Sequence, residues 1–205
     1  MAFDDNVFVN CPFDEDYFPL LRPLLFTILY FRLKPRIALE TIDSGESRLD
    51  KIVRLIRESR YSVHDLSRLQ ASRAGEFYRL NMPFELGIDY GCRTFGGLAL
   101  RTKKTLVLEV DLHRYRAALS DLSGCDIETH DNMPLKVVGA VRKWLRSACG
   151  LAAPGSTKIW GDFNDFMADN YDRLVAQGYS DADITGLAIP ELIDCMTGWL
   201  NEQNH

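Results

Sequence analysis

The sequence of 205 residues lacks the short motifs that mark common nucleotide and metal sites. No GxGxxG follows the first predicted strand and GxxxxGK(S/T) occurs nowhere, which argues against a Rossmann dinucleotide site of the usual kind and against a P-loop. The cysteines form no CxxC pair and no Cys/His cluster with zinc spacing. We therefore expect no bound metal. We interpret the five cysteines as reduced core residues of a cytoplasmic protein: Cys11, Cys92, Cys125, Cys149 and Cys195.

Basic charge and long apolar runs are also scarce. The net charge is −5 and there is no Lys/Arg-rich block, so we do not expect a nucleic-acid partner. The acidic start, Met1–Asn6, lacks the basic residues of a signal peptide. We expect a cytoplasmic protein with no membrane partner, because the longest apolar stretch, 18–33, is too short to span a bilayer and contains Pro19, Arg22, Pro23 and Arg32.

What the sequence does contain is a regular alternation of strand and helix patterns. The unbroken apolar run 105–110, for example, is typical of a strand inside a parallel sheet. Strands that alternate with helices imply a parallel sheet with right-handed crossovers, and hence an α/β fold. The predicted strands are 7–10, 36–40, 61–66, 105–110 and 126–130, and the predicted helices are 17–31, 48–57, a segment around Glu85, 115–122 and 135–149.

The pattern changes after a linker at 150–155, which contains Pro154. Residues 159–176 and 190–201 are predicted to be helical, and Asp181 is a candidate cap for a short helix between them. We therefore divide the chain into an α/β domain, 1–150, and a C-terminal helical extension, 156–205. Aromatic side chains in the extension offer a surface for homo-oligomerisation: Trp160, Phe163, Phe166 and Tyr171.

Polar residues follow two of the predicted strands, at the edge where open α/β sheets bind ligands. Asn10 and Asp14 come after the first strand, and Asp65 and Ser67 after the third. A carboxylate such as Asp65 accepts hydrogen bonds from sugar hydroxyls, and the Asn10 amide both donates and accepts. The alternative for these residues is a structural role as helix or turn caps. His64 and Asp65 are expected on opposite faces of the sheet, because side chains alternate along a strand.

Two polar loops offer further contacts. The loop 41–47, which contains Asp43, could lie over a ligand as a flap, and the alternative is an ordinary surface turn. The loop after the third strand could bind a phosphate through charge-assisted hydrogen bonds, and the alternative is a solvated loop. Its charged residues are Arg68, Arg73, Glu76 and Arg79.

Glu85 is the strongest candidate for chemistry. It stands among apolar residues in the segment Met82–Ile88, where a carboxylate is costly to bury without a partner. Residues four apart share a helix face, so Asn81, Glu85 and Asp89 are expected side by side. Burial raises the pKa of such a carboxyl group. When ionised, it can act as a nucleophile or stabilise a cation at a glycosidic carbon. The alternative is a structural ion pair with an arginine.

Short motifs resemble two related families. Asp43-Ser44-Gly45, the helix that ends before Ser59-Arg60, and Phe84-Glu85-Leu86 resemble the middle of a TIR domain. Cys11-Pro12-Phe13, Asp65-Leu66-Ser67 and Phe84-Glu85-Leu86-Gly87 resemble the nucleoside 2-deoxyribosyltransferase group. The likeness covers about residues 7–150 in the order of elements. The Trp-Cys that precedes the TIR glutamate and the Asp-Ser-Gly that precedes the transferase glutamate are both absent.

Both families share a flavodoxin-like core and cleave N-glycosidic bonds. The resemblance implies a three-layer αβα flavodoxin-like (TIR-like) domain that acts on NAD or a related nucleotide as substrate, with no metal or prosthetic group. The rival hypothesis is a non-catalytic TIR-like module that senses a nucleotide or self-associates in signalling or defence. The resemblance implies that Glu85 is catalytic and that the substrate is bound by Asn10, Phe13, Asp14, Asp43, Asp65, Ser67, Arg79 and Asn81.

Overall fold

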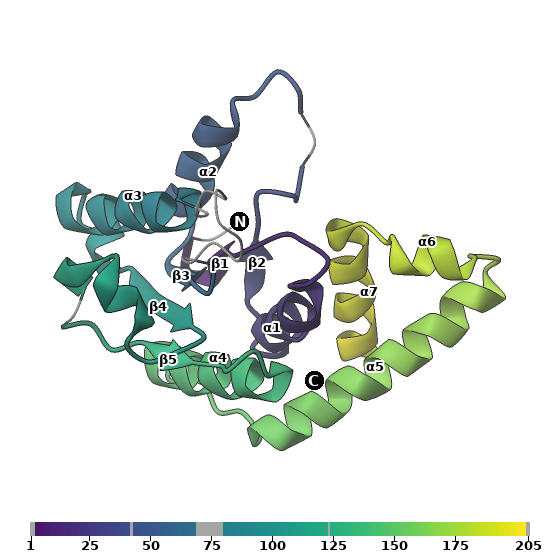
Figure 1. Cartoon of the computed structure of the whole chain (residues 1–205). Coiled ribbons are helices and arrows are strands. Elements are labelled where there is room, and N and C mark those ends of the chain that lie inside the picture. The colour runs from purple at the N-terminus through teal and green to yellow at the C-terminus, as the bar shows by residue number, and fades with distance from the viewer. Residues whose placement is uncertain (1–2, 42, 69–79, 123, 204–205) are drawn as a thin grey trace, which may run out of the picture.

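The computed structural model describes residues 3–41, 43–68, 80–122 and 124–203, and it confirms the predicted α/β fold (Figure 1). Parallel strands form one sheet in the order β2-β1-β3-β4-β5, which is the order of a flavodoxin-like fold. The strands are β1 (Asn6–Asn10), β2 (Lys34–Arg36), β3 (Tyr61–Asp65), β4 (Lys104–Glu109) and β5 (Glu128–Thr129). The helices are α1 (Phe18–Tyr30), α2 (Arg48–Arg57), α3 (Asn81–Phe95), α4 (Pro134–Cys149), α5 (Ser156–Ala176), α6 (Asp181–Thr185) and α7 (Ile189–Glu202).

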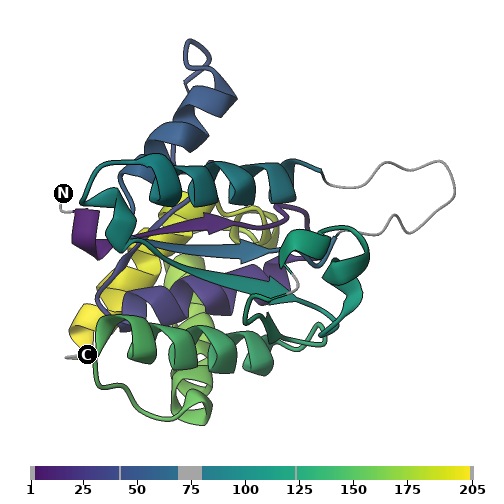
Figure 2. The same cartoon turned by 90° about the vertical axis from the view of Figure 1, so that its left-hand side faces the viewer.

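Helices cover both faces of the sheet (Figure 2). On one face, Phe8 of β1 packs in a cluster with Leu55 and Ile56 of α2, beside α3. On the other face, Val9 of β1 belongs to a larger cluster with residues of α1 and α4. Because β1 and β3 are covered on both sides, every residue in these two strands is buried.

The helix α1 is apolar over most of its surface, and other elements cover most of it. It contacts α4, α5 and α7 as well as the sheet layer, and Leu21, Leu24 and Leu25 have no exposed surface. A helix with so large an apolar surface is stable where other elements cover it. The described residues contain no helix that is both long and apolar enough to cross a membrane.

The C-terminal helices belong to the same core as the α/β domain. The Phe26 ring of α1 lies 5.5 Å from Phe163 and 5.7 Å from Phe166, both in α5, and 6.0 Å from Trp199 in α7, measured between ring centroids. The extension is therefore built onto the outer side of α1. Phe163 and Phe166, which we expected to offer an association surface, are buried in this contact.

Three local predictions were wrong. The second strand is β2, at 34–36, because the chain turns at Ile37, whose carbonyl accepts the Glu40 N–H at 3.0 Å. The predicted helix 115–122 is instead two short 3-10 helices, Arg114–Ala117 and Ser120–Leu122. The cap of α6 is Ser180, which forms a capping box with Asp183, so Asp181 is the first residue of the helix.

We expect Phe26→Ala to lower the free energy of unfolding by about 3–5 kcal/mol, because it leaves a cavity where α1, α5 and α7 meet. Since the helices share one core, tryptophan fluorescence and far-ultraviolet circular dichroism should report a single urea transition. The three tryptophans lie in α4, α5 and α7. Leu98→Ala is the control, because this side chain is 84% exposed. Separate transitions for the two signals would contradict a shared core.

Candidate functional site

The candidate site lies at the carboxyl edge of the sheet, between β1 and β3. From β1 the chain crosses to β2 on one side, and it later returns to β3 on the other. The loops that follow β1 and β3 therefore diverge from neighbouring strand ends, where open α/β sheets place their ligands. The register pairs Asn10 with His64 at this edge.

Asp65 points to the α1 side of the sheet, where polar groups from three segments surround its carboxylate. Its carboxylate accepts hydrogen bonds from the Tyr17 hydroxyl at 2.5 Å and the Ser67 N–H at 2.7 Å, and His130 Nε2 lies 3.1 Å away. Burial alone would raise the pKa of Asp65, but His130, Ser67 and Tyr17 together bring it below its ordinary value. Asp65 has no exposed surface and fixes the loop after β3, and the sugar contact expected of it stays a prediction.

His130 is a member of this group that sequence reasoning missed. It follows β5, and its Nδ1 accepts the Asn132 N–H at 3.1 Å, so in the neutral ring the proton belongs on Nε2, toward Asp65. The signal in the sequence was only a histidine at the end of a weak strand. The pairing joins β5 to β3 across β4, which no spacing along the chain reveals.

His64 points to the α3 side, as the alternation of side chains predicted. Its Nδ1 lies 3.0 Å from the Asn10 amide nitrogen, and its Nε2 lies 3.1 Å from Asp89. The same Asn10 nitrogen donates to the Met82 carbonyl at 2.9 Å. Asn10 is 1% exposed, so its amide anchors the first turn of α3 to β1. The Asn10 Oδ1 has no hydrogen-bond partner among the described residues, and its expected ribose contact stays a prediction.

Asp89 of α3 is the centre of a buried polar network. It accepts the Ser62 hydroxyl at 2.5 Å and forms an ion pair with Lys103 at 3.0 Å. Burial would raise the pKa of Asp89, but His64, Lys103 and Ser62 hold it well below its usual range. Lys103 also donates to the carbonyls of Ile56 and Ser59. The network therefore ties α3 to β3 and to the end of α2.

Glu85 lies one turn before Asp89 on the same face of α3, as predicted. It is 5% exposed, and burial raises its pKa to about 7, although the nearby Arg48 and a hydrogen bond with Asn81 oppose the shift. The charge of Glu85 also helps to raise the pKa of Cys11, after burial and Asp65, which places Glu85 near the end of β1. A carboxyl group that titrates near neutral pH at a ligand-binding edge is a candidate for chemistry.

The other predicted contacts are spread around this edge. Phe13 is half-buried in the loop after β1, and Asp14 lies 3.5 Å from Arg68. Asp43 is exposed, and its carboxylate accepts the Gly45 N–H at 2.8 Å in a local turn. Asn81 is exposed at the start of α3. Three predicted loop residues lie outside the described part of the chain: Arg73, Glu76 and Arg79.

A second pair at the edge was also missed. Glu109 ends β4 with no exposed surface, and Arg114 donates to its carboxylate and to the carbonyl of Ser67. This arginine joins the loops after β3 and β4. The sequence carried a signal, since a buried carboxylate at the end of the strongest strand requires a cation nearby.

Comparisons with protein-family models, with curated proteins and with solved structures find no match to this chain. Within the described residues, no group of three or more His, Cys, Asp or Glu side chains is arranged to hold a metal ion. The residues at the carboxyl edge are therefore the basis for assigning a function to this chain.

We expect Asp89→Asn to lower the free energy of unfolding by about 3–5 kcal/mol, because Lys103 would remain buried without its counter-charge. The double variant Asp89→Asn/Lys103→Met should recover part of the loss, since no unpaired charge remains. Urea denaturation measures both, with the exposed Asp172→Asn as a control that changes stability by less than about 0.5 kcal/mol. If the double variant loses as much free energy of unfolding as Asp89→Asn and Lys103→Met lose together, the Asp89–Lys103 ion pair is not the cause of the loss.

Glu85 should make stability fall as the pH rises. Its pKa is about 7 in the folded chain against an ordinary value of 4.5, so ionisation opposes folding as the pH rises from 4.5 through 7, by at most about 3 kcal/mol. In Glu85→Gln this ionisation is absent. The free energy of unfolding of the variant, relative to that of the native protein, should therefore increase over the same pH interval. Urea titrations at several pH values measure the difference. The exposed Glu202→Gln is the control. If the free energy of unfolding of Glu85→Gln depends on pH as that of the native protein does, the raised pKa of Glu85 is refuted.

Proposed function

We propose that this protein cleaves an N-glycosidic bond in NAD or a related nucleotide, as a hydrolase or transferase, with Glu85 at the anomeric carbon of the ribose. The observation that carries the proposal is a buried carboxyl group, with a pKa of about 7, at the carboxyl edge of a flavodoxin-like sheet. The local resemblance to TIR-type hydrolases and deoxyribosyltransferases supports the same assignment.

The chemistry requires only the ionised form of Glu85. When the bond between the ribose carbon and the base breaks, its electron pair moves to the base, and positive charge develops on the sugar. In NAD the base is a cation that leaves as a neutral molecule, so no metal is required. A carboxylate beside the sugar carbon stabilises this charge or forms a covalent intermediate. Water, or an acceptor base, then completes the reaction, and a proton is released.

The other residues divide into two roles in this proposal. Asn10, Asp65 and Asp89 are positioning residues, because their side chains are buried and hold the strand ends and α3 in place. Asn81 and Arg48 are exposed side chains that act on Glu85, and in this proposal they meet a ribose or a phosphate. Contacts of the substrate with Phe13, Asp14, Asp43 and Ser67, and of a phosphate with Arg79, stay predictions.

The alternative is a non-catalytic module that senses a nucleotide or self-associates. One observation favours self-association, although on a surface other than the C-terminal helices. Leu80, Phe84 and Phe95 are 63%, 57% and 85% exposed, and they lie along one stripe of α3 at helical spacing, with Gly87 and Gly91 between them. An exposed apolar stripe of this kind is typical of a protein interface.

Release of free base from NAD and from nucleosides, measured by chromatography, tests the proposal. Glu85→Gln keeps the shape and removes the charge, so we expect base release to fall at least about 100-fold. Native activity should rise between pH 6 and 8 as Glu85 ionises. Glu202→Gln serves as the matched control. Base release that survives in Glu85→Gln would refute the assignment.

Two further measurements separate the alternatives if no base is released at any protein concentration. Equilibrium dialysis with NAD detects a sensor, which binds the nucleotide without cleaving it. Sedimentation of the native protein against Phe84→Ser detects self-association through α3, which the polar substitution should weaken.

A further inference from the structure

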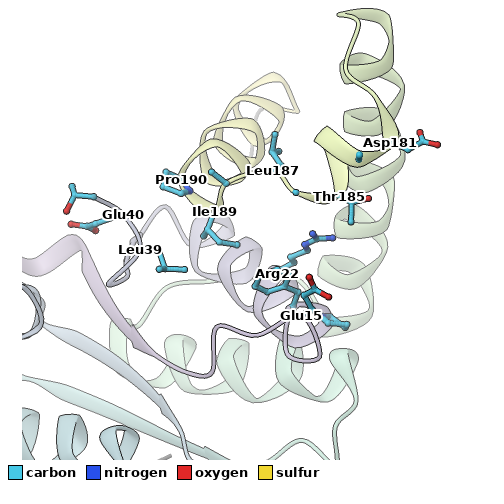
Figure 3. Close-up of a pocket in the computed structure, with 15 residues that line it drawn as sticks. Glu15, Arg22, Leu39, Glu40, Asp181, Thr185, Leu187, Ile189 and Pro190 are labelled. Atoms are coloured by element: carbon cyan, nitrogen blue, oxygen red, sulfur yellow. The ribbon is translucent and has the colours of Figure 1, made fainter. Parts of the chain in front are cut away.

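A cavity lies between the α/β domain and the C-terminal helices (Figure 3), and Glu85 is not among its lining residues. It has a volume of about 1170 Å³, which is large enough for a small organic ligand. Its walls come from the start of α1, the loop after β2 and the connection from α6 to α7. Most of the lining side chains are apolar, and they include Phe18, Pro19, Leu39, Leu187, Ile189 and Pro190.

Arg22 is the only basic residue in the lining, among the described residues, and its side chain points between α1 and the connection from α6 to α7 (Figure 3). Its guanidinium lies 5.6 Å from the centre of the Phe18 ring. Its Nε is buried and has no hydrogen-bond acceptor within the part of the chain that the structure describes. Burial also lowers the pKa of Arg22. A half-buried cation without an anion is unfavourable, and a ligand that supplied one would relieve the penalty.

The acidic residues of the lining do not supply that anion. Glu40 is held by Arg36 through two hydrogen bonds of 2.8 and 2.9 Å. Asp181 accepts the Tyr171 hydroxyl at 2.7 Å. Glu15 is exposed, and within the described residues it forms no ion pair with Arg22. The cavity therefore combines apolar walls with one cation whose charge is not compensated.

We propose that this cavity binds a small organic anion, with an apolar aromatic or aliphatic body against the walls and one carboxylate or sulfonate group on Arg22. The planar guanidinium suits such a group because it donates two parallel hydrogen bonds to a pair of oxygens. The body of the ligand is buried against α1 and α7, so its binding requires the C-terminal helices. The site does not depend on the glycosidic chemistry proposed for Glu85, which is not among the lining residues.

Two fluorescent probes that share a ring system test whether Arg22 binds the anionic group of the ligand. Anilinonaphthalene sulfonate carries one anionic group, and phenylnaphthylamine has the same rings without it. We expect Arg22→Gln to weaken the binding of the sulfonate about tenfold and to leave the binding of the neutral probe unchanged. Exposed Arg146→Gln is the matched control for loss of positive charge elsewhere.

A second variant tests the location. Ala182 is exposed in the wall formed by α6, so Ala182→Trp should fill the cavity and remove saturable binding of both probes while circular dichroism stays native. The proposal is overturned if sulfonate binding is unchanged in Arg22→Gln, if both probes lose affinity equally in that variant, or if Ala182→Trp binds them as tightly as the native protein.

Discussion

The carboxyl edge of this protein depends on one constraint at the end of β3. His64 and Asp65 are adjacent, so the pleat of the strand directs them to opposite faces of the sheet. Each meets a polar partner from a different layer: His64 meets Asp89 of α3, and Asp65 meets Tyr17, which immediately precedes α1. A shift of one residue in the register would exchange the two side chains and leave buried charges without partners. The strand end therefore fixes both helix layers relative to the sheet.

The position of Glu85 follows from that constraint. α3 is held at its first turn by the Asn10 amide, which donates to the Met82 carbonyl, and near its middle by Asp89. Glu85 lies between these two anchors, so it cannot move away from the sheet without breaking one of them. The pKa of Asp89 is low because cations and donors surround its carboxylate, whereas for Glu85, among the described residues, the charge of Arg48 and a hydrogen bond with Asn81 oppose the effect of burial without overcoming it. Two carboxylates one turn apart thus acquire very different pKa values, which separates a structural role from a chemical one.

The sequence predicted those features that depend on local periodicity. The bounds of α2 and the start and end of β3 were within one residue of the structure, because apolar spacing and strand alternation act over a few residues. The roles of Asn10 and Asp65 could not be predicted in the same way. Their partners, Met82 and His130, are 72 and 65 positions away in the sequence, and only the packed fold brings them together. The prediction of a strand at 36–40 was wrong for a different reason, since the ladder with β1 ends at Arg36 and the chain turns at Ile37.

The C-terminal helices cover an apolar face of α1 that would otherwise be exposed to solvent. An outer helix of a three-layer fold usually presents a polar face to solvent, but Phe26 makes the outer face of α1 apolar, and α5 and α7 cover it. The chain that connects α5 to α7 lies away from the start of α1. The space between them is the cavity that Arg22 lines. The same stretch of chain serves both sites: Tyr17 holds Asp65 at the carboxyl edge, while Phe18 and Arg22, one turn apart on α1, line the cavity. The hydrogen bond that fixes the loop after β3 and one wall of the cavity therefore come from the same turn of the chain.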